Sequence, residues 1–162
     1  SEFNLNGIFT TTYDHYMILA SGLGVTSSGG YWSIRLNKAS DNSHITSNYT
    51  NTSLAYGGGT TGAQRDGGAW RLSSATNNYP VTSGEQAPML QITVFAPFLS
   101  MPTKFTNFSH YRDNGNSAWY TEMNMGHNTD NTSVGGLNFN ADSGQNAATS
   151  EVSAITVYGF QK

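Results

Sequence analysis

Ala154-Ile155-Thr156-Val157-Tyr158-Gly159-Phe160 is the stretch of sequence that decides the fold. Its side chains alternate along the chain, which is typical of a β-strand with two different faces. Near the other end of the sequence, Tyr13–Leu23 has the character of a second strand and contains a Ser-Gly pair that would end it. We expect these two strands to lie side by side in one sheet, which would close a β-sandwich.

Strand signals recur between these two segments, with turn signals separating them. In Tyr31–Leu36 the side chains of Trp32, Ile34 and Leu36 share one face, which we expect to be buried. Met89–Phe98 has the strongest strand pattern of the chain. The other expected strands are a weak polar one near a sheet edge at His44–Tyr56, one that starts at Trp70, and one at Leu137–Asn140.

A β-hairpin is expected in the second half of the chain. Phe105–Arg112 and Ala118–Met125 flank the turn Asp113-Asn114-Gly115-Asn116. Asn-Gly between strand-like runs predicts a hairpin because both residues tolerate positive φ. No segment of helical length has apolar residues spaced three and four apart. We therefore predict an all-β protein with a jelly-roll-like antiparallel β-sandwich.

The chain is expected to form a single domain over residues 4–162. Its 162 residues suffice for one hydrophobic core. Ser1-Glu2-Phe3 has the character of an expression linker, so we leave these residues out of the expected fold. On this interpretation the domain is the C-terminal part of a longer protein.

Composition excludes several classes of partner. Charged residues make up 10% of the chain, and the formal net charge is -3 with only 7 Lys and Arg. No basic stripe is available for phosphates, so we expect no nucleic acid partner. No apolar run approaches the roughly 18 residues of a membrane span, so we expect no membrane insertion. The absence of Cys from the sequence excludes disulfides and thiolate metal sites, and suits folding in a reducing cytoplasm.

Catalytic and metal-binding patterns are weak in this sequence. The 4 His and 10 acidic residues are scattered, without a triad signature or a Gly-x-Ser-x-Gly motif. The turn at Asp113–Asn116 offers oxygen atoms that calcium prefers, but the hairpin already explains these residues. We therefore predict that the protein is not an enzyme and binds no metal and no cofactor.

Several short motifs carry a resemblance that spans nearly the whole chain. They are Tyr13-Asp14-x-Tyr16-x-Ile18, Ser33-Ile34-Arg35-Leu36, the following Tyr49, Phe95-Ala96-Pro97-Phe98 and Thr156-Val157-Tyr158-Gly159-Phe160. In this order they resemble the β-rich terminal domains of bacteriophage tail-fibre and minor structural proteins of the receptor-binding type. The resemblance implies a virion component of the tail or fibre that is not an enzyme and is assembled in the cytoplasm of a bacterial host.

The same resemblance implies partners. Other virion tail subunits would contact the domain. The resemblance does not indicate a ligand; if the fibre tip binds one, we expect it to be a polysaccharide of the host surface. Because fibre tips are commonly trimeric, a homotrimer is expected, with the surplus rings of Tyr16, Tyr49 and Tyr158 available for its interface.

Ligand-binding residues are expected around a glycine-rich loop. Gly57–Gly68 contains 6 glycines and is longer than a β-framework needs, which is typical of a binding loop. Tyr31 and Tyr120 fall on the opposite strand faces from Trp32 and Trp119, and are therefore expected to be exposed. The candidate ligand-binding residues are Tyr31, Arg65, Asp66, Trp70, Arg71 and Tyr120, although Trp70 also fits a core position.

Two other functions fit the same sequence. A carbohydrate-binding module of a secreted bacterial protein would have a similar composition and would use the same exposed aromatic rings. A small hydrolase is the third hypothesis. A hydrolase domain on the same polypeptide would favour the module, whereas a neighbouring tail gene would favour the virion protein.

Overall fold

The computed structural model describes residues 2–25, 32–56, 61–64, 67–72, 89–112, 119–141, 147–148 and 154–161. All regular elements within these segments are β-strands, so the predicted all-β class is confirmed. The strands are β1 (Glu2–Leu5), β2 (His15–Ser21), β3 (Gly24–Val25), β4 (Trp32–Lys38), β5 (Tyr49–Tyr56), β6 (Thr61–Gln64), β7 (Trp70–Arg71), β8 (Met89–Phe95), β9 (Thr103–Arg112), β10 (Trp119–Asn128), β11 (Val134–Ala141), β12 (Ala147–Ala148) and β13 (Ala154–Phe160).

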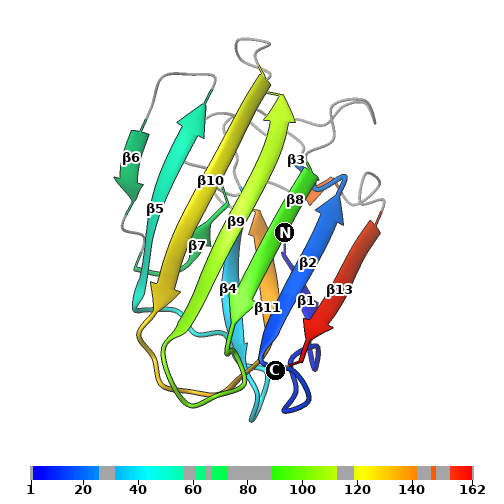
Figure 1. Cartoon of the computed structure of the whole chain (residues 1–162), viewed down its shortest axis with the longest axis vertical. Helices are drawn as coiled ribbons and strands as arrows, with labels where there is room; N and C mark the ends of the chain where they lie inside the picture. The colour runs from blue at the N-terminus through cyan, green and yellow to red at the C-terminus, as the bar shows by residue number, and fades with distance from the viewer. Residues whose placement is uncertain are drawn as a thin grey trace.

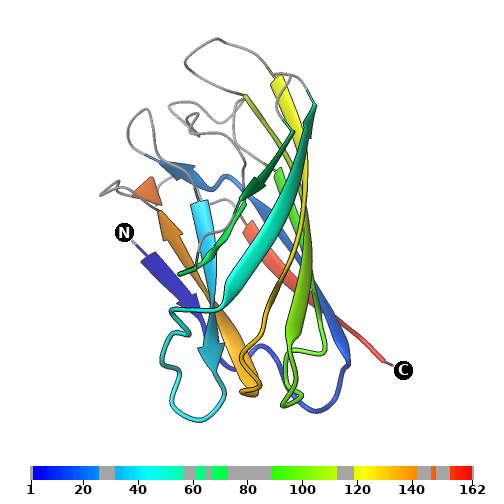
Figure 2. The same ribbon diagram turned by 90° about the vertical axis from the view of Figure 1, so that its left-hand side faces the viewer.

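Two antiparallel sheets pack face to face as a sandwich (Figures 1 and 2). The large sheet has the strand order β13-β2-β8-β9-β10-β5-β6, and the small sheet has the order β1-β11-β4-β7. A short ladder of β12 with β3 lies apart from both. Figure 2 shows the small sheet covering only one face of the large sheet.

The strand pairing follows a jelly roll. In that topology the first strand of the jelly roll pairs with its last strand, which is β11 here, and the second pairs with the last but one. Here β1 pairs with β11 and β2 pairs with β8, provided that the meander β8-β9-β10 is counted as one unit. The last strand, β13, then extends the large sheet beyond β2.

The last strand of the sequence and the strand predicted at Tyr13–Leu23 are neighbours, as expected. β13 pairs with β2 in antiparallel register from Ala154 opposite Ser21 to Phe160 opposite His15. The amide N–H of Asp14 donates to the carbonyl of Phe160 at 3.2 Å, which continues the ladder by one bond. Sheet hydrogen bonds therefore hold the final strand along its whole length.

The predicted hairpin is also confirmed. β9 and β10 pair along their whole length, from Trp119 opposite Arg112 to Asn128 opposite Thr103. The turn at 113–116 lies outside the described residues, so the type of turn remains a prediction.

Apolar side chains from both sheets fill the space between them. Trp32, Ile34 and Leu36 of β4 have no exposed surface, as their alternation predicted. The inward residues of β8 are equally buried, and the ring of Trp70 stacks on Phe105 with centroids 4.0 Å apart. The largest fully buried side chains are Trp32, Trp70, Tyr49, Tyr111, Phe9, Phe105, Phe139, Ile18, Leu23, Ile34 and Leu36.

The structure corrects the limits that we set on the fold. Glu2 and Phe3, which we left out, belong to β1, and the ring of Phe3 stacks on Phe139 with centroids 4.8 Å apart. Inside the expected loop Gly57–Gly68, residues Thr61–Gln64 form β6 and pair with β5. β6 is hard to predict from the sequence because it contains Gly and Ala, which are depleted in strands.

The expected trimer residues are corrected as well. Tyr16 and Tyr49 are 2% exposed and belong to the core, whereas Tyr158 is 46% exposed. Tyr16 and Tyr49 can be buried because their hydroxyl groups form hydrogen bonds inside the protein. The Tyr16 hydroxyl bonds to the backbone of Thr10, accepting from its N–H at 2.7 Å and donating to its carbonyl at 3.1 Å.

Tyr49 ties the large sheet to the small sheet. Its hydroxyl accepts a hydrogen bond from the amide N–H of Leu36 at 2.9 Å and donates one to the carbonyl of Ile45 at 2.8 Å. Burial raises the pKa of Tyr49, although the hydrogen bond from Leu36 acts in the opposite direction. The neutral phenol is therefore the form that the fold stabilises.

Replacing Tyr49 by Phe should destabilise the protein by about 1–3 kcal/mol, because the buried amide of Leu36 loses its acceptor. The raised pKa means that this contribution is complete below about pH 10, the pKa of an unfolded tyrosine, and declines at higher pH. Urea unfolding between pH 7 and pH 11 measures both effects. The exposed Tyr158→Phe is the control and should change stability by less than about 0.5 kcal/mol. A difference between wild type and Tyr49→Phe that grows with pH would contradict this account.

Gly136 is required where β1 crosses close to β11. A Cβ atom at this position would collide with the carbonyl oxygen of Leu5 and would lie 3.0 Å from Cα of Asn6. Both are backbone atoms, so Gly136→Ala should displace β1 and cost about 1–3 kcal/mol of unfolding free energy. Gly67→Ala is the matched control, because a Cβ there meets nothing within 4 Å. Equal unfolding midpoints for the two variants in thermal denaturation would refute the role of this close approach.

Candidate functional site

The outer face of the large sheet is the broadest candidate surface in the described part of the chain. Each strand of this sheet sends alternate side chains inward to the core and outward to solvent. No other described strand packs on the outward side (Figure 2). Within the described residues, no strand therefore separates these side chains from a partner.

The strand register aligns these outward side chains in rows. One row consists of Leu54, Met123, Phe108, Gln91, Leu19 and Thr156. The next row consists of Thr52, Met125, Thr106, Thr93, Met17 and Tyr158. We call these two rows the central patch; it crosses the large sheet from β5 to β13.

The central patch is uncharged, and seven of its twelve side chains are apolar or aromatic. Leu54 is 59% exposed, Met125 is 53% exposed and Met123 is 46% exposed. Between the apolar side chains lie only Thr and Gln, so no position of the patch carries a charge. Single exposed apolar residues are common on protein surfaces and have no special meaning. Several large ones gathered on one sheet face are typical of a contact surface.

Titratable side chains lie around the central patch. The next row toward one end of the strands contains Lys104, His15 and His127. Toward the other end, the ring of His110 stacks on Trp119 with centroids 5.0 Å apart and bonds to Thr121 at 2.9 Å. Lys104 is the only Lys, Arg, Asp or Glu among the outward side chains that the structure describes on this face. An apolar centre with a polar rim is the usual anatomy of a protein interface.

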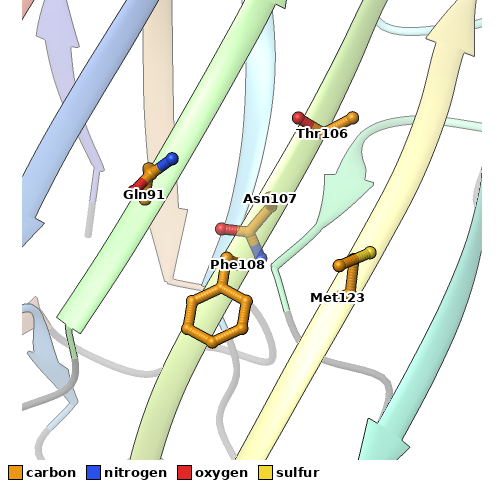
Figure 3. A pocket seen from close by; sticks show the side chains of 5 residues that line it. All are labelled: Gln91, Thr106, Asn107, Phe108 and Met123. Carbon is orange, nitrogen blue, oxygen red and sulfur yellow. The ribbon is translucent and has the colours of Figure 1, made fainter.

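A groove of about 310 Å³ crosses the middle of the central patch (Figure 3). Figure 3 shows Gln91 of β8, Phe108 of β9 and Met123 of β10 on neighbouring strands, with Thr106 beside them. The ring of Phe108 is 39% exposed, and the amide of Gln91 lies next to it in register. An exposed ring beside an amide and a hydroxyl can hold a neutral sugar by stacking and hydrogen bonds.

The residues that we expected to bind ligand do not gather on this face. Trp70 is fully buried, and its indole N–H donates to the carbonyl of His127 at 3.1 Å. Arg71 is half-buried on β7 of the small sheet. Tyr31, Arg65 and Asp66 lie outside the described residues.

The expected exposure of Tyr120 is wrong. Tyr120 is 5% exposed and stacks on Tyr111 inside the sandwich, whereas its neighbour Trp119 is 48% exposed. We had assumed that the larger ring would turn inward. The reason for the reversal is the polar interior beneath this part of the sheet, where the Tyr111 hydroxyl donates to a carboxylate oxygen of Glu122 at 2.7 Å.

A buried polar cluster organises this interior. The carbonyl oxygen of Leu72 accepts hydrogen bonds from the side-chain amides of Asn107 at 3.0 Å and Asn124 at 3.1 Å. It also accepts a longer bond of 3.3 Å from the hydroxyl of Ser109. These donors fix Leu72, the residue after β7, against β9 and β10. The role of this cluster is therefore structural. The candidate site lies on the opposite, outer face of the same strands.

Other kinds of site have little support in the described segments. No group of three or more His, Asp or Glu side chains in these segments is placed to hold a metal ion. They also contain no helix of the length and apolarity needed to cross a membrane. Comparisons with protein-family models, with curated proteins and with solved structures returned no match to this chain.

The cluster at Leu72 makes a specific prediction for Asn107→Asp. At pH 7 the variant loses a donor to the Leu72 carbonyl and buries a carboxylate, so it should lose at least about 2 kcal/mol of unfolding free energy. Burial raises the pKa of an introduced carboxyl group, so part of the loss should be recovered at pH 4, where the protonated acid can donate. Chemical denaturation at pH 7 and at pH 4 measures the unfolding free energy. Asn131→Asp, at an exposed position, is the control. A variant that is equally stable at both pH values relative to wild type would show that the bond is dispensable.

Proposed function

We propose that this chain is a structural domain of a bacteriophage tail or tail fibre that contacts its partners through the outer face of the large sheet. The observation that carries the proposal is the central patch, because it is a wide, uncharged, apolar surface presented by a rigid sheet. Such a surface suits contact with a macromolecule better than it suits catalysis. The proposed location is the virion, with assembly in the cytoplasm of the bacterial host.

The motifs that resemble tail-fibre domains support this proposal at the level of the fold. Ala96 takes a positive φ of 52° where the chain leaves β8, and the carbonyl of the following Pro97 accepts from the amide of Val134 at 2.8 Å. The motif at 95–98 thus turns the chain and fastens it to the start of β11. The terminal motif forms β13, which completes the large sheet. These are roles in a stable scaffold, which a virion protein needs outside the cell.

The rim of the face also favours a role without catalysis. His15 and His127 lie on separate strands, and the described residues place no carboxylate on the outer face beside either one. General acid–base catalysis needs such groups within hydrogen-bond reach of one another or of a substrate. The aromatic and methionine side chains of the central patch offer contact area instead.

A carbohydrate-binding module is the second candidate, and the groove at Phe108 is the observation that favours it. A host surface polysaccharide could lay one sugar on the exposed ring while Gln91 and Thr106 bond to its hydroxyl groups. This use is compatible with a virion protein at a fibre tip and with a secreted module. Finding the protein in phage particles or in a secreted polypeptide would distinguish these two functions.

Immunogold labelling tests the proposed location. Antibodies raised against the recombinant domain should label the tail of phage particles that carry this gene. Labelling of a secreted polypeptide that also carries a hydrolase domain, with no labelled particles, would reject the virion role and favour the module.

Binding to bacterial surface polysaccharides tests the groove. If the groove holds sugar, Phe108→Ala should weaken binding by at least about tenfold, because stacking on the ring is lost. Phe160→Ala is the matched control, since Phe160 is 45% exposed on the same sheet but does not line the groove. Equal affinities of the two variants, measured by calorimetry, would remove the groove from consideration.

A further inference from the structure

We propose that the central patch is covered by a second copy of this chain, so that the domain associates with itself through the outer face of its large sheet. This inference rests on the proposed function, which makes the face a contact surface, and it names the partner. Of the interface residues that the sequence suggested, it keeps Tyr158, whereas Tyr16 and Tyr49 lie in the core.

The charge pattern of the face favours a partner identical to itself. A patch with several like charges would repel its own copy, whereas the central patch carries none. Lys104 lies in the rim, where its ammonium group can remain in water when the centre is covered. A nucleic acid, an acidic surface or a basic peptide would find no opposite charges in the centre. The whole chain is only weakly charged, at -3, so long-range repulsion between copies is small.

The residue types match the centre of a protein interface. Aromatic residues and Met are enriched in such centres, and Lys, Glu and Asp are depleted. The central patch follows this pattern with Phe108, Tyr158 and the methionines Met17, Met123 and Met125. Methionine side chains are flexible, so they can fill the gaps between two sheet faces that pack together.

The size of the face agrees with a stable contact between proteins. Strands lie about 4.8 Å apart and rows of side chains on one face lie about 6.8 Å apart. The two central rows with the rim row on each side, taken from β5 to β13, therefore cover roughly 29 Å by 27 Å, or about 800 Å². A stable interface buries about 800 Å² on each partner. The groove at Phe108 covers only a small part of this area, so one bound sugar would leave most of the apolar surface in water.

The rigidity of the face lowers the cost of association. Backbone hydrogen bonds hold β2, β8, β9, β10 and β5 in register along their length. Little backbone order has to be gained on binding, and the remaining cost falls on side chains. Two such faces can pack like the layers of a sandwich, about 10 Å apart.

Light scattering coupled to size-exclusion chromatography tests the inference on the full chain. At high micromolar concentration, the mass measured for the wild-type protein should be at least twice the mass of one chain. Met123→Lys places a charge in the centre of the patch and should raise the dissociation constant by at least about a hundredfold, leaving a monomer. Met125→Lys should act in the same way, which guards against a fault particular to one variant.

Met101→Lys is the matched control. Met101 is 43% exposed, close to the 46% of Met123, but it lies in the segment between β8 and β9, outside the central patch. This variant should keep the mass of the wild type, and circular dichroism should show the same fold in all variants. A monomeric wild type at 200 µM, or folded Met123→Lys and Met125→Lys variants that stay associated, would overturn the proposal.

The outcome is independent of the proposed location in the virion. A monomeric chain whose antibodies label phage tails would end the inference and leave the proposed function in place. An associated chain that is absent from phage particles would keep the interface and reject the proposed function.

Discussion

The large sheet has two faces, and the rest of the structure follows from the fact that the small sheet covers only one of them. Side chains alternate along every strand, so each buried residue has outward neighbours. The core is therefore built from β4, β7, β11 and the inward residues of β2, β5, β8, β9 and β10, while the opposite side of the sheet displays Met, Phe, Leu and Thr to solvent. The size of this face is the basis for the proposed self-association, and its lack of charge favours a second uncharged face as the partner.

Much of the scaffold could be predicted from the sequence because its signals are local. The pairing of β13 with β2, the β9–β10 hairpin and the burial of Trp32 follow from alternation and from the Asn-Gly turn signal. The pairing of β1 with β11 and the edge strand β6 could not be predicted in the same way. Both depend on contacts between residues far apart in the chain, and their own sequences are too short or too polar to signal a strand.

The candidate site was missed because polarity is inverted on β9 and β10. Glu122 and Asn124 point into the sandwich, whereas Met123 and Met125 point out of it. A pattern-based interpretation places the apolar side chains inward, so it turns Tyr120 toward solvent and hides the exposed methionines. Only the contacts of the buried polar groups, with Tyr111 and with the carbonyl of Leu72, explain why the strands face this way. A run of alternating Met beside alternating Asn and Glu was the one signal in the sequence that could have revealed the face.

The oxidation of individual methionines by hydrogen peroxide, followed by mass spectrometry, tests most directly whether the outer face is covered. Met123, Met125 and Met101 have similar exposure in the single chain, at 46%, 53% and 43%. If a second copy covers the central patch, Met123 and Met125 should oxidise more slowly than Met101 in concentrated protein and at a similar rate after dilution. Equal rates for the three residues at every concentration would contradict the account.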